Sequence, residues 1–265
     1  MSTAAATQSA FAQDFATVSV LWRRDIVRFF RERTRVVGAL VQPLIFWFVI
    51  GSGLSPTFHM EAAADVSYMA YFFPGVILMV VLFTSIFATM SLIEDRHNGF
   101  MQAVLVGPGS RGAVVLGKSL GSTTVALVQA SLFVLLAPLA GFGYASIDWP
   151  MLAFVLLLTS LALTTTGFAV AWWLDSTQGY HVVMSVLLLP LWIMSGAMFP
   201  APRSLQRVLA FNPMSHSVGA LRRALYGGMP PAGTVLASAG VELGVLIAFA
   251  ITGFAFALVL AVRKR

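Results

Sequence analysis

The sequence contains no cysteine and few charged residues. Of its 265 residues, 10% are charged and 58% are hydrophobic, and the mean hydropathy is +0.88. Without cysteine there is no disulfide framework, no thiolate metal site and no cysteine nucleophile. Soluble domains carry about 25% charged residues, and several apolar stretches here reach the ~20 residues that cross a bilayer. The composition therefore indicates an all-α polytopic membrane protein, and the continuous apolar runs exclude a β-barrel.

The apolar stretches predict six transmembrane helices. Their expected ranges are 36–54, 68–93, 117–140, 150–174, 180–199 and 235–262. With both termini on one side, that side holds twelve Lys and Arg residues and the other side holds four. This bias places both termini in the cytoplasm. Residues 1–35 are then a cytoplasmic N-terminal region, and residues 36–265 form one six-span domain.

The net charge of +6 has a simple explanation in a membrane protein. Basic residues that flank apolar spans set the orientation of the chain in the bilayer. We therefore expect no nucleic-acid partner.

The segment 18–35 is expected to form a basic amphipathic helix. Its apolar residues recur at helical spacing, and its arginines lie mostly on the other side of the helix. Such a helix lies in the headgroup plane, with its arginines near anionic lipid. The alternative is a cytosolic helix with a solvated basic face.

Two short helices are expected between the fifth and sixth spans, at 203–210 and 215–226. Asn212-Pro213 separates them, and the Gly227–Pro231 stretch ends the second. Neither is long enough to span a bilayer, so both are placed in the outer membrane face.

The stretch Gly112–Ser119 matches the phosphate-binding pattern GxxxxGK[ST]. A phosphate-binding loop needs a preceding buried strand, turn-forming residues and an α/β domain. Here the four variable positions are Ala, Val, Val and Leu, and a membrane span follows. We therefore interpret Lys118 as a snorkelling residue at the membrane edge and expect no nucleotide site in this chain.

Other candidate chemistry is weak. Ser195, with His216 or His181, allows a rhomboid-like serine–histidine dyad, although serine beside glycine in a span is usually a packing feature. Glu242 is a possible functional acid within the sixth span. It also lies near enough to the outer surface to reach water, Arg222 or Arg223. The scarcity of further buried charges argues against an ion-coupled carrier, so energy for transport must come from another chain.

The polar stretch 94–118 lies between the second and third spans and has a helical pattern of its own. One face of the predicted helix carries the apolar residues Phe100, Met101, Val104 and Leu105. Glu94 and Asp95 are expected at its start, where acids favour the helix dipole. A short amphipathic helix held between two spans suits a groove on a soluble partner. The alternative is an interfacial loop without a partner.

Several motifs resemble those of a known family. They are EDRHNGF at 94–100, VLVGPGSR at 104–111, LGK at 116–118, SGAMFP at 195–200, and Asn212-Pro213 followed by Arg222. This set is similar to the signatures of type-2 ABC exporter permeases, of which the drug- and antibiotic-exporting branch is the nearer. The resemblance runs from about Val18 to the C-terminus. Asp95, His97, Asn98 and Phe100 depart from the commoner residues, so the charge match to a particular ATPase is open.

The resemblance implies a half-transporter that is not itself catalytic. Two permease chains, identical or sister, would form the pathway in a bacterial inner membrane, and two copies of an ABC ATPase would bind ATP and Mg²⁺ below it. The resemblance assigns the ATPase-coupling helix to Glu94, Asp95, Arg96, Gly99, Phe100, Met101, Val104, Leu105, Pro108 and Arg111. It assigns the external exit to Ser195, Gly196, Phe199, Pro200, Asn212, Pro213 and Arg222. An amphiphilic drug, antibiotic, lipid-like molecule or glycan is the expected substrate. The competing hypothesis is a membrane-embedded enzyme or a scaffold without an ATPase.

Overall fold

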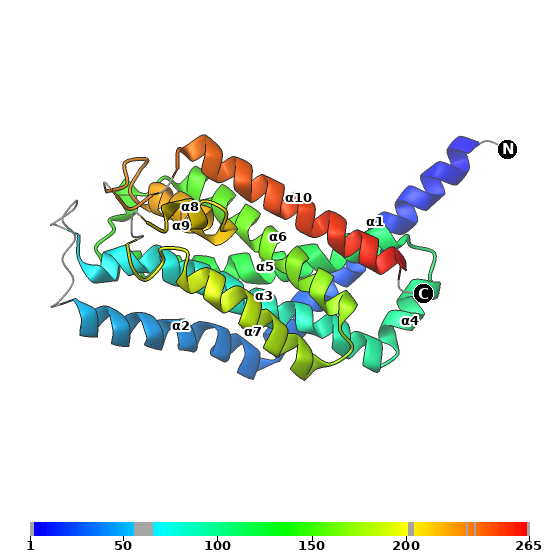
Figure 1. The fold of residues 1–265 in the computed structure, drawn as a ribbon. Coiled ribbons are helices and arrows are strands. Elements are labelled where there is room, and N and C mark those ends of the chain that lie inside the picture. Colours follow the sequence, from blue (N-terminus) through cyan, green and yellow to red (C-terminus); the bar gives the residue numbers. More distant parts are fainter. Residues whose placement is uncertain (1–2, 56–65, 201–203, 232, 236, 264–265) are drawn as a thin grey trace.

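The structure is a computed structural model that describes residues 3–55, 66–200, 204–231, 233–235 and 237–263 (Figure 1). Across these ranges the fold is all-helical. The α-helices are α1 (Thr3–Arg31), α2 (Arg33–Leu54), α3 (Tyr68–His97), α4 (Phe100–Val106), α5 (Arg111–Val134), α6 (Trp149–Trp173), α7 (Thr177–Ile193), α8 (Gln206–Leu209), α9 (Pro213–Leu225) and α10 (Ala239–Arg263). Two short 3-10 turns, Ala137–Ala140 and Tyr144–Ser146, follow α5.

Five helices in the described ranges are long and apolar enough to cross a membrane. They are the Val36–Leu54 part of α2 together with α3, α5, α6 and α10. The shorter apolar helix α7 has 17 residues, which is near the lower limit of about 17 for a span. The predicted class, an all-α membrane protein with several spans, is confirmed.

Helix boundaries differ from the predicted ranges for local reasons. α5 ends at Val134 instead of residue 140 because the ring of Pro138 would clash with the Val134 carbonyl in a continuing helix. α7 ends at Ile193 instead of residue 199, and Gly196 then turns the chain with φ of 78°. The predicted external helix at 203–210 is shorter in the structure, where only α8 (Gln206–Leu209) is helical. Residue 203, the first of the predicted range, lies outside the described residues. The predicted helix at 215–226 corresponds to α9.

Short polar side chains begin several of the helices. Ser67, Ser110 and Asp148 each accept a hydrogen bond from the backbone amide three residues further on, at 3.2, 3.1 and 3.0 Å. Ser176 does the same for α7 at 3.2 Å. These caps satisfy amides that have no partner inside the helix, so they fix where α3, α5, α6 and α7 start.

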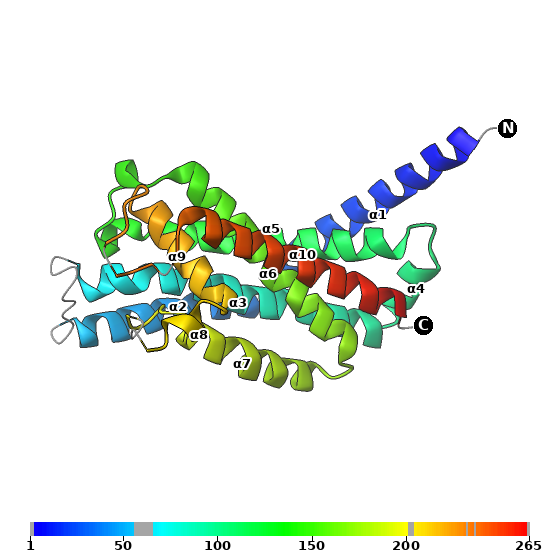
Figure 2. The same ribbon diagram turned by 45° about the horizontal axis from the view of Figure 1, so that its top comes forward.

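The central helix of the bundle is α3. Its apolar stretch is 83% buried, against 22% for α2 and 28% for α10. It packs against α2, α5, α6 and α7, and α10 packs on α6 at the periphery (Figures 1 and 2). α3 is therefore in contact with most of the bundle.

The two ends of the bundle carry different elements. α4, the start of α1 and the end of α10 lie at one end, which we call the inner end, on the right in Figure 1. α8 and α9 lie at the other, the outer end. This is the arrangement expected of a chain whose termini share one side of a membrane.

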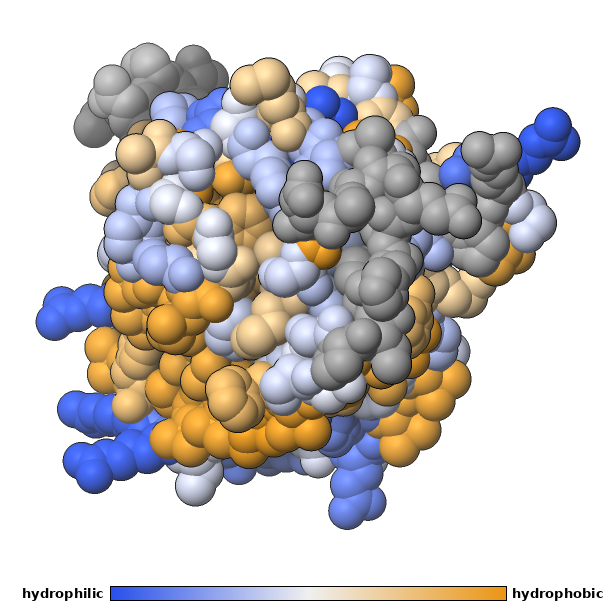
Figure 3. Space-filling view, turned by 90° about the vertical axis from the view of Figure 1, so that its left-hand side faces the viewer, coloured by the Kyte–Doolittle hydropathy of each residue, from blue (hydrophilic) through white to orange (hydrophobic). Residues whose placement is uncertain are grey.

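The peripheral helices expose apolar side chains. On α2 these include Val37, Ile45 and Phe48, which are 56%, 57% and 65% exposed. In the view onto the outer end, the lower margin, where α2 and α7 lie in Figure 1, is strongly apolar (Figure 3). Such surfaces are compatible with lipid and unfavourable in water.

Candidate functional site

The predicted coupling segment forms a turn and a short helix at the inner end. α3 continues to His97, Gly99 turns the chain with φ of 75°, and α4 follows over seven residues. Positive φ is readily adopted by glycine and strained for most other residues. Gly99 therefore sets the direction of α4 relative to α3.

Glu94 and Asp95 do not begin the coupling helix, as the sequence interpretation proposed. They lie in the last turns of α3, where the negative end of the helix dipole disfavours acids. Arginines of α1 compensate for this unfavourable position by binding both carboxylates. Arg24 donates two hydrogen bonds to Asp95 at 2.9 and 2.7 Å, and Arg28 donates to Asp95 at 2.7 Å and also pairs with Glu94.

Lys118 does not snorkel to the membrane edge. It is 1% exposed, and its Nζ lies 2.8 Å from Asp25 Oδ2 and 2.8 Å from Asp95 Oδ2. The snorkelling interpretation is wrong because two carboxylates inside the bundle neutralise the ammonium group. We call Arg24, Asp25, Arg28, Glu94, Asp95 and Lys118 the ionic cluster; it joins α1, α3 and α5.

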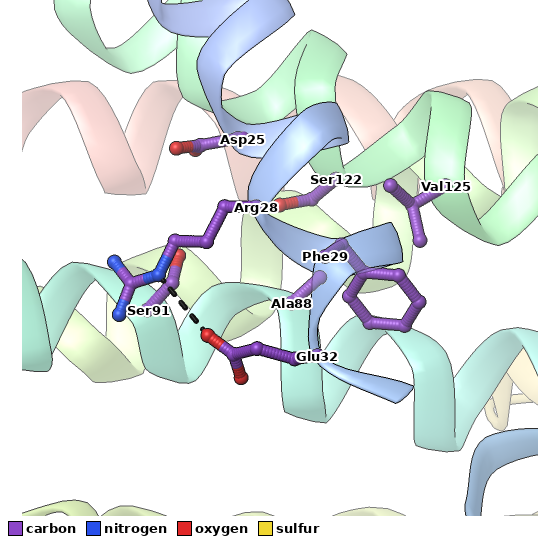
Figure 4. A pocket seen from close by; sticks show the side chains of 8 residues that line it. All are labelled: Asp25, Arg28, Phe29, Glu32, Ala88, Ser91, Ser122 and Val125. Carbon is purple, nitrogen blue, oxygen red and sulfur yellow. Dashed lines mark hydrogen bonds and ion pairs between the residues drawn. The ribbon is translucent and has the colours of Figure 1, made fainter. Parts of the chain in front are cut away.

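The ionic cluster also touches α4 and borders a small cavity. The Arg24 guanidinium lies 3.6 Å from the centroid of the Phe100 ring, and its hydrogen bond to Asp95 raises the pKa of Arg24. Beside the cluster is a cavity of about 10 Å³, with room for about one water. Figure 4 shows Asp25 and Arg28 of α1 around it, together with Glu32, which lies between α1 and α2 and pairs with Arg28 at 3.3 Å.

Two arginines of the coupling segment bind the ends of other helices. Arg96 donates to the carbonyls of Ala171 and Leu174, both at 3.0 Å, where α6 ends, and it pairs with Asp175. Arg111 donates to the carbonyls of Ala261 and Val262, both at 2.9 Å, in the last turn of α10. Basic side chains satisfy carbonyls that lack partners at helix C-termini. The segment 94–111 is thus attached to α1, α6 and α10.

The apolar stripe of α4 faces the bundle. Met101 is 1% exposed, and Phe100, Val104 and Leu105 pack against the hydrophobic core. This differs from the sequence interpretation, in which the stripe met a partner. The open face of α4 instead carries Gln102, Ala103 and Val106 and continues to Pro108. Val106 is 88% exposed.

The stretch Gly112–Ser119 is helical throughout, within α5. A phosphate-binding loop needs an irregular backbone whose amides converge on the anion. The rejection of this motif as a phosphate loop is therefore supported by the structure.

At the outer end, the residues of the second motif come together around Arg222. This side chain is 3% exposed and donates to the carbonyls of Gly196 at 2.8 Å, Thr234 at 2.6 Å and Tyr71 at 3.3 Å. Asn212 caps α9, with Pro213 in its first turn, and donates to the Leu191 carbonyl at 2.6 Å. Phe199, in contrast, is 53% exposed. Arg222 thus holds α3, α9 and the turn after α7 together.

Replacing Arg222 with methionine is expected to lower the free energy of unfolding by about 2–3 kcal/mol. The change removes hydrogen bonds from a charged donor and leaves buried carbonyls without a partner. Thermal unfolding of the detergent-solubilised protein measures it. Arg207→Met on exposed α8 is the control, and equal stability of the two variants would contradict a structural role for Arg222.

Glu242 lies in the first turn of α10, closer to the outer end than the sequence interpretation placed it. It is 1% exposed and pairs with Arg223 at 3.2 Å. Of the two interpretations, the one in which Glu242 reaches an arginine at the outer surface is favoured. Its carboxylate also fits over Gly219, where an added Cβ would lie 2.3 Å from Glu242 Oε1.

The proposed serine–histidine dyad does not form in the described part of the chain. Ser195 donates to the Trp192 carbonyl at 2.6 Å. His216 lies 2.8 Å from the Ala210 carbonyl, and His181 lies 3.2 Å from Ser185. Neither histidine hydrogen-bonds Ser195, so its hydroxyl has no base to activate it.

The described helices form a bundle with several apolar spans, which defines the class of multi-pass helical membrane proteins. A family model described as "ABC-2 type transporter" matches residues 16–226. The chain belongs to the ABC-2 type transporter family.

Curated relatives are similar to this chain over most of its length, and two of the three described here have permease names. Nodulation protein J of Rhizobium leguminosarum bv. viciae is 25% identical over 88% of this chain and 89% of the relative. The putative transport permease ycf38 of Cyanophora paradoxa is 24% identical over 77% of this chain and 72% of the relative. The daunorubicin resistance ABC transporter permease protein DrrB1 of Streptomyces coeruleorubidus is 25% identical over 80% of this chain and 75% of the relative. The resemblance drawn from the sequence motifs is confirmed.

Proposed function

We propose that this chain is the membrane subunit of an ATP-driven exporter and that α4 receives the movement of a separate ABC ATPase. The observation that carries the proposal is the attachment of the segment 94–111. Glu94 and Asp95 bind it to α1, Arg96 to α6 and Arg111 to α10. A displacement of α4 is thereby passed to helices on several sides of the bundle.

The proposal includes an assembly. Two permease chains, identical or sister, line the pathway, and two ATPase copies bind ATP and Mg²⁺, while this chain binds no cofactor. Both termini and α4 face the cytoplasm of a bacterial inner membrane, α7 serves as the sixth transmembrane helix, and the Phe199–Pro200 turn with α8 and α9 shapes the exit. The proposed substrate is an amphiphilic drug, antibiotic, lipid-like molecule or glycan, and the name of the daunorubicin resistance relative supports a drug.

Co-purification tests the proposal. The tagged chain is expressed in its native host, extracted in a mild detergent, and the proteins that accompany it are identified. Recovery of an ATP-hydrolysing subunit is expected. If none is recovered, the scaffold without an ATPase becomes the better hypothesis.

Val106→Asp is expected to reduce the recovery of the ATPase several-fold. The side chain is 88% exposed on the open face of α4, and a buried unpaired charge at an interface is unfavourable. Phe211→Asp is the matched control, because Phe211 is 89% exposed at the opposite end of the bundle. Equal ATPase recovery with both variants would place the docking surface elsewhere.

A further inference from the structure

The second half of α1 packs closely along α5. A Cβ added at Gly117 would lie 3.0 Å from the Val18 backbone, and one added at Gly121 would lie 3.1 Å from the Asp25 Cβ. Helices approach this closely only where one of them lacks side-chain bulk. Lys118 lies between these two glycines, so the ionic cluster occupies the tightest part of the contact.

Further hydrogen bonds hold α1 at residues that precede the ionic cluster. Asp14 accepts from the Ser110 amide at 2.6 Å and from its hydroxyl at 2.8 Å, in the loop directly after α4. Trp22 donates to Thr124 of α5 at 3.0 Å. α1 is therefore fixed to the α4–α5 connection as well as to α3 and α5.

The buried charges define geometry more than they add stability. Replacing a buried ion pair with well-packed apolar residues is often neutral or stabilising. Ion pairs with directed hydrogen bonds instead fix one relative position of the groups they join, because any displacement leaves charges unpaired. Lys118, Asp25 and Asp95 come from three different helices, so the position they fix is that of three helices relative to one another.

We propose that Lys118, Asp25 and Asp95 are positioning residues that clamp α1 into the coupling apparatus, so that α1, α4 and the inner ends of α3 and α5 move as one rigid unit. Arg24 completes the unit, because it binds Asp95 and lies over the Phe100 ring of α4. In this arrangement α1 is a force-bearing element of the bundle instead of a helix that floats on lipid headgroups. The inference rests on the proposed function in one respect only, namely that an ATPase supplies the force on α4.

A distance measurement on the full chain tests the rigid unit. The native sequence has no cysteine, so cysteines placed at Val20 of α1 and Val106 of α4, both exposed, can carry the only two spin labels. In lipid nanodiscs we expect one narrow distance distribution. Lys118→Met is expected to broaden it into several populations. Arg23→Met, at an exposed position of α1, is expected to leave it unchanged.

A second variant distinguishes loss of the clamp from misfolding of the Lys118→Met protein. The double substitution Asp25→Asn with Lys118→Met removes one charge of each sign and leaves Asp95 with Arg24 and Arg28. It is expected to keep the fold, judged by gel filtration, and to lose the single narrow peak. A folded double variant that keeps the native distribution would overturn the clamp.

The complex with the ATPase gives the decisive measurement. For this measurement the second label is moved from Val106, which lies on the proposed docking face, to Asn98, which is exposed in the turn between α3 and α4. The Val20–Asn98 distance is expected to be the same without nucleotide and after trapping with ATP and vanadate. A shift between these states with the ionic cluster intact would overturn the rigid unit. Failure to recover an ATPase would instead count against the proposed function, and the nanodisc measurement would still decide the clamp.

Discussion

Replacing Gly99 with proline is expected to reduce the ATPase recovered with the chain by at least about tenfold, a loss of about 1.4 kcal/mol in binding, while membrane insertion is unchanged. Gly99 has φ of 75°, whereas the proline ring fixes φ near −65°. Proline also removes the amide that donates to the Arg96 carbonyl. The turn must then reorganise, and α4 loses its direction relative to α3.

Gly99→Asn is the matched control, because asparagine tolerates the left-handed conformation better than other residues. It is expected to retain most of the ATPase. Quantitative co-purification, with the amount of permease in the membrane fraction as reference, measures both variants. If Gly99→Pro retains as much ATPase as the native chain, α4 is not the docking helix.

Asp95→Asn is expected to lower the free energy of unfolding by about 3–5 kcal/mol, because it leaves buried cations without their counter-ion. Asp95 is 1% exposed and accepts from Arg24, Arg28 and Lys118. A neutral amide presents one oxygen to these donors and turns its own NH₂ group toward them. Unfolding in detergent, followed by tryptophan fluorescence, measures the change.

Glu94→Gln makes the same chemical change one residue earlier. The Glu94 side chain is 22% exposed and pairs with Arg28, so a loss below about 1 kcal/mol is expected. A large difference between the two variants shows that burial makes the ionic cluster sensitive to charge. Similar small losses would mean that water reaches Asp95.

The helices and the class of protein could be predicted from composition and local pattern. Long apolar runs leave little alternative to spanning helices, and capping residues such as Ser67 and Ser110 lie at the helix starts. These features depend on neighbours in the sequence, which a single sequence displays.

The ionic cluster could not be predicted in the same way. Asp25 lies in an arginine-rich segment, where an acid suggests only a solvated ion pair, and its partner Lys118 lies 93 positions away. Hydrophobic periodicity carries no information about which helix packs beside Lys118. The residue was therefore assigned to a membrane edge. The orientation of the α4 stripe was missed for a related reason. An amphipathic pattern shows that one face of a helix is buried. It does not show whether that face is buried by a partner protein or by other helices of the same chain.

The separation of Asp25 and Asp95 from Lys118 along the chain also orders the assembly of the protein during synthesis. Both acids leave the ribosome before the lysine that joins them, so the inner ends of α1 and α3 have only arginine partners until α5 is made. The N-terminal half therefore reaches its final arrangement only when α5 inserts beside it. Truncated chains that stop before Lys118 should accordingly be recognised and degraded as incomplete, whereas chains that extend through α5 should persist in the membrane.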